Sequence, residues 1–155
     1  MRRWMASAAL VLGLAGGAEA QLADQKVLTL AAVKQVMNAA EAEAARNGWS
    51  VSIAIVDAHG ELLAFRRLDG ASLASIDISR GKARTAARMR RPTKAIEDAI
   101  AAGRMAMLSV EGLVALQGGV PIVVDGVVIG AVGVSGVTSQ QDEQVATAGI
   151  AALRP

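Results

Sequence analysis

The chain has 155 residues, of which 53% are hydrophobic and 19% are charged, with a formal net charge of +2 and no cysteine. This length predicts one domain, since domains run to roughly 100–200 residues, and a core of that size needs no covalent staple. The lack of cysteine excludes disulfides, thiolate metal sites, iron–sulfur clusters and a cysteine nucleophile. The high apolar content and low net charge exclude a disordered chain.

The first twenty residues have the pattern of an export signal. The positive start Met1-Arg2-Arg3 precedes an uncharged stretch over residues 4–17, and Ala18-Glu19-Ala20 supplies a small–x–small cleavage site. The uncharged stretch is shorter than the roughly 18–20 apolar residues of a membrane span. We therefore predict a signal peptide over residues 1–20 and a single domain over 21–155. The mature protein is expected to be periplasmic or secreted, without stable membrane insertion.

The mature chain reads as alternating blocks of helix and strand. In chain order, the pattern predicts a helix over 30–46, strands over 49–57 and 62–65, helices over 73–90 and 93–100, strands over 120–124 and 127–134, and a helix beginning near 138. Residues 105–116 are compatible with either a helix end or a strand. Asp125-Gly126 between two β-branched runs predicts a hairpin with a type I′ turn. These elements predict an α+β sandwich.

Cations are concentrated on the second predicted helix. Four arginines share one stripe at positions i, i+4, i+8 and i+11: Arg80, Arg84, Arg88 and Arg91. The stripe is either a solvated face or a surface that attracts small anions. A nucleic-acid site is not expected, because the mature chain offers only Trp49 and Phe65 for base stacking.

Lys82 and a run of glycines stand out beside this stripe. Lys82 lies about 200° from Arg80 around the helix and so points inward, where it needs an anionic partner from the protein or from a ligand. Six glycines fall within residues 118–136, and small residues along a strand allow close approach of a backbone or a flat ligand. Gly136, at the start of the last helix, could form an anion nest. Packing between subunits is the alternative explanation of these glycines.

The single histidine, His59, falls in a predicted turn. It is either a metal ligand or proton carrier, or a solvated turn residue. One histidine and no cysteine disfavour a zinc site. A triad of Ser135, His59 and an aspartate is disfavoured as well, because the Gly-x-Ser-x-Gly elbow is missing.

Several motifs together resemble the GlcG/HbpS-type haem-binding family. They occupy residues 56–71, 82–87, 118–122, 130–136 and 141–143, and the resemblance extends over about 28–153. It implies a profilin-like sandwich, with an antiparallel sheet of about five strands covered by helices, that assembles into homo-oligomers. It also implies haem as cofactor, with a corrinoid as the alternative, since the family is related to the C-terminal domain of PduO-type adenosyltransferases. Some members are partners of sensor proteins.

The motifs and the resemblance combine into one site hypothesis. A slit between the glycine-rich strand and the Lys82 helix would hold the apolar disc, with cations at its rim. Arg67 and Lys82 would pair with the propionates, and Asp69 would orient Arg67. Thr85, Ser135 and Gly136 would complete the cofactor contacts. His59, or a methionine such as Met37, would approach the iron.

The expected function is therefore an exported protein that binds haem or a related tetrapyrrole, for sequestration or sensing, rather than an enzyme. Two alternatives remain open at this stage. One is an enzyme that acts on a small carboxylate through Lys82 or Asp69 in the same pocket. The other is an oligomeric interaction module, or partner of a sensor, without a cofactor.

Overall fold

A computed structural model describes residues 24–153, so the predicted signal peptide lies outside the described residues. The elements are α1 (Leu30–Arg46), β1 (Ser52–Asp57), β2 (Leu62–Arg67), α2 (Ala74–Met89), α3 (Thr93–Ala101), a 3₁₀ helix η1 (Met105–Ser109), β3 (Gly119–Val124), β4 (Val127–Ser135) and α4 (Ser139–Ala151). Among the described residues, no helix is both long and apolar enough to cross a membrane.

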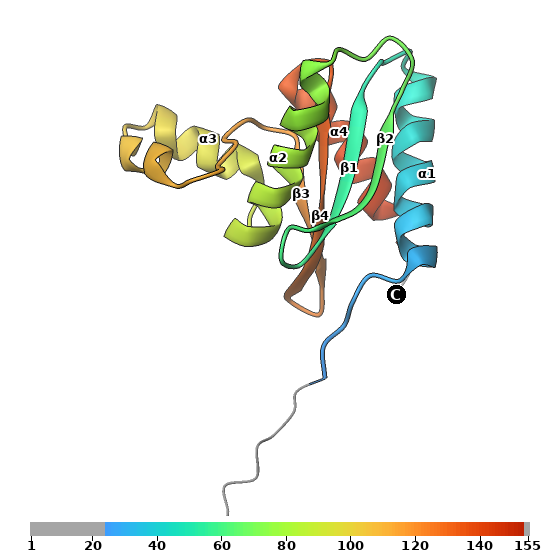
Figure 1. The fold of residues 1–155 in the computed structure, drawn as a ribbon, viewed down its shortest axis with the longest axis horizontal. Helices are drawn as coiled ribbons and strands as arrows, with labels where there is room; N and C mark the ends of the chain where they lie inside the picture. The colour runs from blue at the N-terminus through green and yellow to red at the C-terminus, as the bar shows by residue number, and fades with distance from the viewer. Residues whose placement is uncertain (1–23, 154–155) are drawn as a thin grey trace, which may run out of the picture.

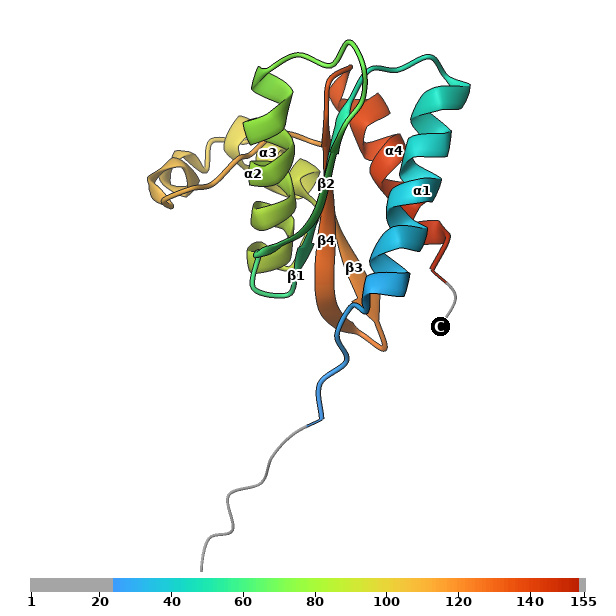
Figure 2. The ribbon, with the colours of Figure 1, turned by 45° about the vertical axis from the view of Figure 1, so that its right-hand side comes forward.

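The strands form one antiparallel sheet in the order β2-β1-β4-β3. Helices α1 and α4 cover one face of this sheet and α2 covers the other, which gives three layers (Figures 1 and 2). The α+β, profilin-like sandwich is therefore confirmed, with four strands where about five were predicted.

The missing strand is the ambiguous stretch 105–116. It forms η1 and a series of turns that, with α3, projects from the sandwich on the α2 side (Figure 1). We call residues 93–116 the arm. Because the arm leaves the sheet, this stretch has no neighbouring strand with which to pair. The arm is anchored at its start by buried Thr93, whose hydroxyl accepts from the Gly119 amide at 2.8 Å. Near its end Val114 packs against Gly81 and donates its amide N–H to the Thr85 hydroxyl.

The hairpin of β3 and β4 turns as predicted. Asp125 and Gly126 both have positive φ, +50° and +76°, which is the signature of a type I′ turn. Asp125 also forms an ion pair with Lys26, and this pair ties the segment before α1 to the tip of the hairpin.

The two faces of the sheet differ in how close their helices come. The α1–α4 face buries valine, isoleucine and methionine side chains, whereas the α2 face buries mainly alanines. On that face, a Cβ added to Gly133 of β4 would lie 2.1 Å from the Ser79 carbonyl oxygen, and one added to Gly119 of β3 would lie 2.4 Å from the Lys82 carbonyl oxygen. Glycine is thus required at both positions because the α2 backbone packs directly on the sheet.

Candidate functional site

The slit predicted between the glycine-rich strand and α2 is filled. Backbone of α2 occupies the space over Gly119 and Gly133, so no flat ligand fits between the helix and the strand. The prediction of a slit was wrong for a physical reason: glycines in a strand allow close approach equally to a ligand and to a helix, and here the helix takes the place.

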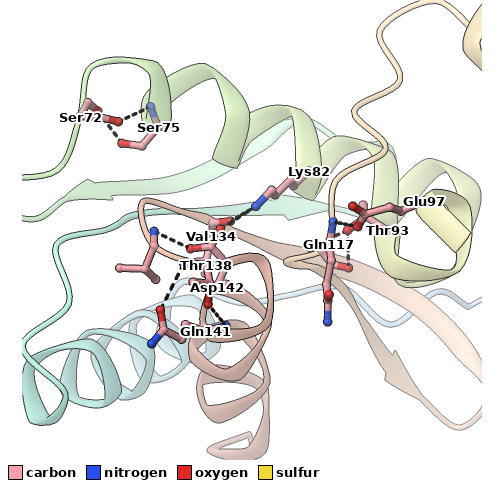
Figure 3. A network of polar contacts seen from close by, with 12 residues as sticks. Ser72, Ser75, Lys82, Thr93, Glu97, Gln117, Val134, Thr138, Gln141 and Asp142 are labelled. Atoms are coloured by element: carbon pink, nitrogen blue, oxygen red, sulfur yellow. Dashed lines mark hydrogen bonds and ion pairs between the residues drawn. The ribbon is translucent and has the colours of Figure 1, made fainter. Parts of the chain in front are cut away.

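Lys82 points inward, as predicted, and its partner belongs to the protein. Its side chain is 2% exposed, and Nζ donates to Asp142 Oδ2 at 2.7 Å and to the Val134 carbonyl oxygen at 2.9 Å (Figure 3). The assignment of Lys82 to a propionate, or to the carboxylate of a substrate, depended on an open slit. With Asp142 in place, the arrangement gives that assignment no support.

Asp142 connects three elements through its two carboxylate oxygens. Oδ2 receives Lys82 from α2, and Oδ1 accepts from the Val137 amide just before α4, which also carries a capping box at Thr138 and Gln141. Burial raises the pKa of Asp142 above its ordinary value, while the hydrogen bond and charge of Lys82 and the backbone N–H of Val137 oppose that rise. The Lys82–Asp142 ion pair therefore joins α2 to the end of β4 and to α4, and its role is structural.

The remaining predicted cofactor residues do not converge on one cavity. Arg67 ends β2, is exposed, and donates from Nε to the Ala71 carbonyl oxygen at 3.1 Å. Asp69 is exposed in the following turn, and among the described residues no hydrogen bond or ion pair joins it to Arg67, so its orienting role stays a prediction. Thr85 is buried under the arm.

Ser135 and Gly136 lie at the end of β4, at the same end of the sheet as Arg67, since Ser135 and Arg67 both pair with Ser52 of β1. Ser135 is the last residue of β4 and is buried. Gly136 has a φ of +152°, and a Cβ there would lie 2.4 Å from the Ser50 carbonyl oxygen, so it is needed for packing rather than for an open nest. Met37 is buried in the core on the inner face of α1, which rules it out as an iron ligand in this arrangement.

His59 occupies the tip of the β1–β2 hairpin, in a turn with several internal restraints. Asp57 Oδ1 accepts from the backbone N–H groups of His59 at 2.8 Å and Glu61 at 2.9 Å. Arg88 on α2 donates from Nε to the His59 carbonyl oxygen at 2.8 Å. The backbone of the turn is thereby fixed, while the His59 side chain stays 77% exposed.

The carboxylate of Asp57 lies near the imidazole that it helps to position. Its Oδ2 is 3.9 Å from His59 Nδ1. Partial burial would raise the pKa of Asp57, but the N–H donors of Glu61 and His59 outweigh this and hold it below its ordinary value. When the proton sits on Nδ1, facing this carboxylate, Nε2 is available to ligate a metal.

An apolar pocket adjoins His59. It measures about 250 Å³ and is lined by Lys26, Leu28, Asp57, His59, Leu63 and Ile129, among others. A larger groove of about 400 Å³ continues on the other side of residues 27–28, between the start of α1, the β3–β4 hairpin and the end of α4. Both cavities include Val27, Leu28 and Ile129 in their walls. We call this pair of cavities the hairpin-end site.

Sequence reasoning identified His59 but missed Lys26, Leu28 and Ile129. Lys26 and Leu28 precede the first helix, where no periodicity marks them. One signal was available: Gly130 lies within β4, and a Cβ there would lie 2.5 Å from Leu28 Cδ1. A glycine in a strand indicates that another segment comes close, and here that segment is the chain before α1.

Within residues 24–153, no group of three or more histidine, cysteine or acidic side chains could hold a metal ion. His59 is thus a single candidate ligand in this part of the chain. In haem the porphyrin supplies the equatorial ligands and the protein supplies axial ones.

The chain was compared with known proteins. Residues 28–151 match the family model described as "Haem degrading protein HbpS-like". Protein GlcG of Escherichia coli strain K12 is 48% identical over 109 residues, which cover 70% of this chain and 81% of GlcG.

Solved structures give the same assignment. A double mutant of HbpS from Streptomyces reticuli superposes with a TM-score of 0.81 at 33% identity, covering 97% of this chain and all of that one (100%). The structure of PduOC in complex with haem superposes with a TM-score of 0.77 at 30% identity, covering 83% of this chain and 96% of that one.

The role of the buried pair can be tested by substitution. Lys82→Met should lower the free energy of unfolding by about 3–5 kcal/mol, because it leaves the Asp142 carboxylate buried without a counter-charge. Adding Asp142→Asn removes that charge yet keeps an acceptor for the Val137 amide, so the double variant should be more stable than Lys82→Met alone. Urea denaturation measures both. If Lys82→Met lowered the free energy of unfolding by less than about 1 kcal/mol, as is typical of an exposed ion pair, a structural role for the buried pair would be contradicted.

Proposed function

The chain belongs to the HbpS-like family, and from this membership we propose that it binds haem at the hairpin-end site, with His59 as the iron ligand. The description of the family model names haem, and the similar structure of PduOC was solved with haem bound; both support the choice of cofactor. The exposed imidazole of His59 beside an apolar pocket is the observation that carries the choice of site.

The residues of the hairpin-end site suit the chemistry of haem. Leu28, Leu63 and Ile129 offer apolar surface to a macrocycle, and Asp57 can set the tautomer of His59. The pocket of about 250 Å³ is smaller than the roughly 300–1,000 Å³ of sites that enclose a whole ligand. It would therefore hold one edge of the macrocycle, and the groove beyond residues 27–28 offers further apolar surface. When bound, haem would supply redox-active iron with axial positions for ligands.

The structure favours ligand binding over acid–base catalysis by Lys82 or Asp69. The proposed enzyme needed Lys82 or Asp69 in one pocket, yet Lys82 is bonded to Asp142 and Asp69 is exposed in a separate turn. We propose further that residues 1–20 direct export and that the mature domain sequesters or senses haem in the periplasm or outside the cell. A corrinoid is the alternative ligand, and a sensor protein as partner stays a prediction.

Titration with hemin tests this proposal. Protein lacking residues 1–20 should shift and sharpen the Soret band of hemin, and His59→Ala should weaken binding by at least about tenfold, or about 1.4 kcal/mol. Added imidazole should restore the wild-type spectrum in His59→Ala, because the exposed position leaves the ligand site open to it. Circular dichroism controls for folding.

Each possible failure has a separate meaning. An unchanged Soret band with wild-type protein removes haem as the ligand, and a parallel titration with cobalamin then tests the corrinoid. A spectrum that His59→Ala leaves unaltered removes His59 as the ligand while haem binding stands.

The arm supports assembly into a homo-oligomer as an additional property. Four of its large apolar side chains are exposed: Met105, Leu108, Val110 and Leu116. Soluble monomers rarely expose such clusters, and a second copy of the chain would cover them.

Association through the arm predicts that two leucine-to-glutamate substitutions, one inside the arm and one outside it, differ in their effect on self-association. Leu108→Glu should weaken self-association at least about tenfold, as loss of an interface anchor does. Leu73→Glu, at an exposed leucine before α2 and outside the arm, should not. Sedimentation velocity over a concentration series measures both. Equal sedimentation of the two variants and the wild type would show that the arm is not an interface.

A further inference from the structure

Arg84 lies directly against the turn that carries His59. A Cβ built on Gly60, the residue after His59, would be 2.9 Å from Arg84 Cγ. The stem of Arg84 therefore approaches the turn from the α2 side, and Arg84, which is exposed, also lines the small cleft between α2 and residues 110–113. Arg88, four residues further along the same face of α2, reaches the same turn through the His59 carbonyl oxygen.

The three cations around this turn differ in whether they have a partner. Lys26 forms an ion pair with Asp125, and Arg88 forms one with Glu61 at 3.3 Å. Among the described residues, Arg84 has neither a hydrogen bond nor an ion pair with a carboxylate. Glu111 lines a small cleft with Arg84 and Arg88 but lies beyond ion-pair distance of both. Arg84 is the cation of this turn that is free to receive an external anion.

The cations first assigned to the propionates are poorly placed for a ligand at His59. Lys82 is buried with Asp142, and Arg67 lies at the opposite end of β2 from the turn, bonded to the Ala71 carbonyl oxygen. A planar guanidinium can donate two parallel hydrogen bonds to one carboxylate, which a lysine cannot do.

We infer that Arg84 receives a propionate carboxylate of haem bound at His59. The inference rests on the proposed function, since it requires a ligand that brings both an iron atom to His59 and a carboxylate within reach of Arg84. It assigns to the arginine stripe a recognition role at one position, while Arg80, one turn earlier and 3.9 Å from Asp77, stays part of the solvated face.

The test compares hemin with hemin dimethyl ester, in which both propionates are esterified and uncharged. Arg84→Gln should weaken hemin binding roughly threefold to tenfold, as expected for a charge-assisted contact near the surface. The same variant should bind the dimethyl ester as the wild type does. Arg80→Gln, the matched control on the same helix, should leave both affinities unchanged, and Arg84→Lys should recover part of the loss.

The outcomes separate this inference from the proposed function. If the wild type fails to bind hemin, the proposed function is lost. If hemin binds and depends on His59, yet Arg84→Gln weakens hemin and the ester equally, or weakens neither, the propionate contact is refuted on its own. An equal loss of hemin affinity in Arg80→Gln would also refute it, because it would show only a general effect of positive charge.

Discussion

The close approach of α2 to the sheet determines what the rest of this molecule can do. Gly119 and Gly133 provide no side chain where the α2 backbone lies, and the alanines of α2 face them. Interiors pack as densely as organic crystals, so such a contact leaves no room for a cofactor. Lys82, carried inward by this helix, meets Asp142 at 2.7 Å, and the pair joins α2 to the start of α4. One face of the sheet is thus closed.

Because this face is closed, the proposed ligand site lies at the end of the sandwich. The β1–β2 turn, the β3–β4 hairpin and the chain before α1 all lie at this end (Figure 2). The two cavities of the hairpin-end site lie on either side of residues 27–28 there. Function often resides in turns placed on a rigid scaffold, and Asp57 and Arg88 give this turn its rigidity. His59 presents an imidazole there, and Leu28 and Ile129 present apolar surface. Arg84 approaches the same turn from α2 and has no hydrogen-bond or ion-pair partner among the described residues.

Sequence patterns predicted the scaffold better than the site. Periodicity and the Asp125-Gly126 turn located the helices and the hairpin, because local preferences and burial act in the same direction there. Residues 105–116 were ambiguous, since a strand exists only if a neighbour pairs with it. Lys82 was correctly expected to need an anion, but sequence could not show whether the anion was a ligand or Asp142, sixty residues away in the chain. The residues around His59 come from four segments: the chain before α1, the β1–β2 hairpin, α2 and β4. Only folding brings these segments together.

Paramagnetic NMR of the ferric haem complex locates the ligand directly. Paramagnetic iron broadens the amide signals of nearby residues. Addition of ferric haem should therefore weaken the amide signals of residues 25–28 and 57–61, while those of residues 118–119 and 133–136 keep their intensity. Selective loss of the second set, with the first unaffected, would place haem between α2 and the glycine-rich strand. It would show that α2 separates from the sheet to admit the cofactor, contrary to the closed packing described above.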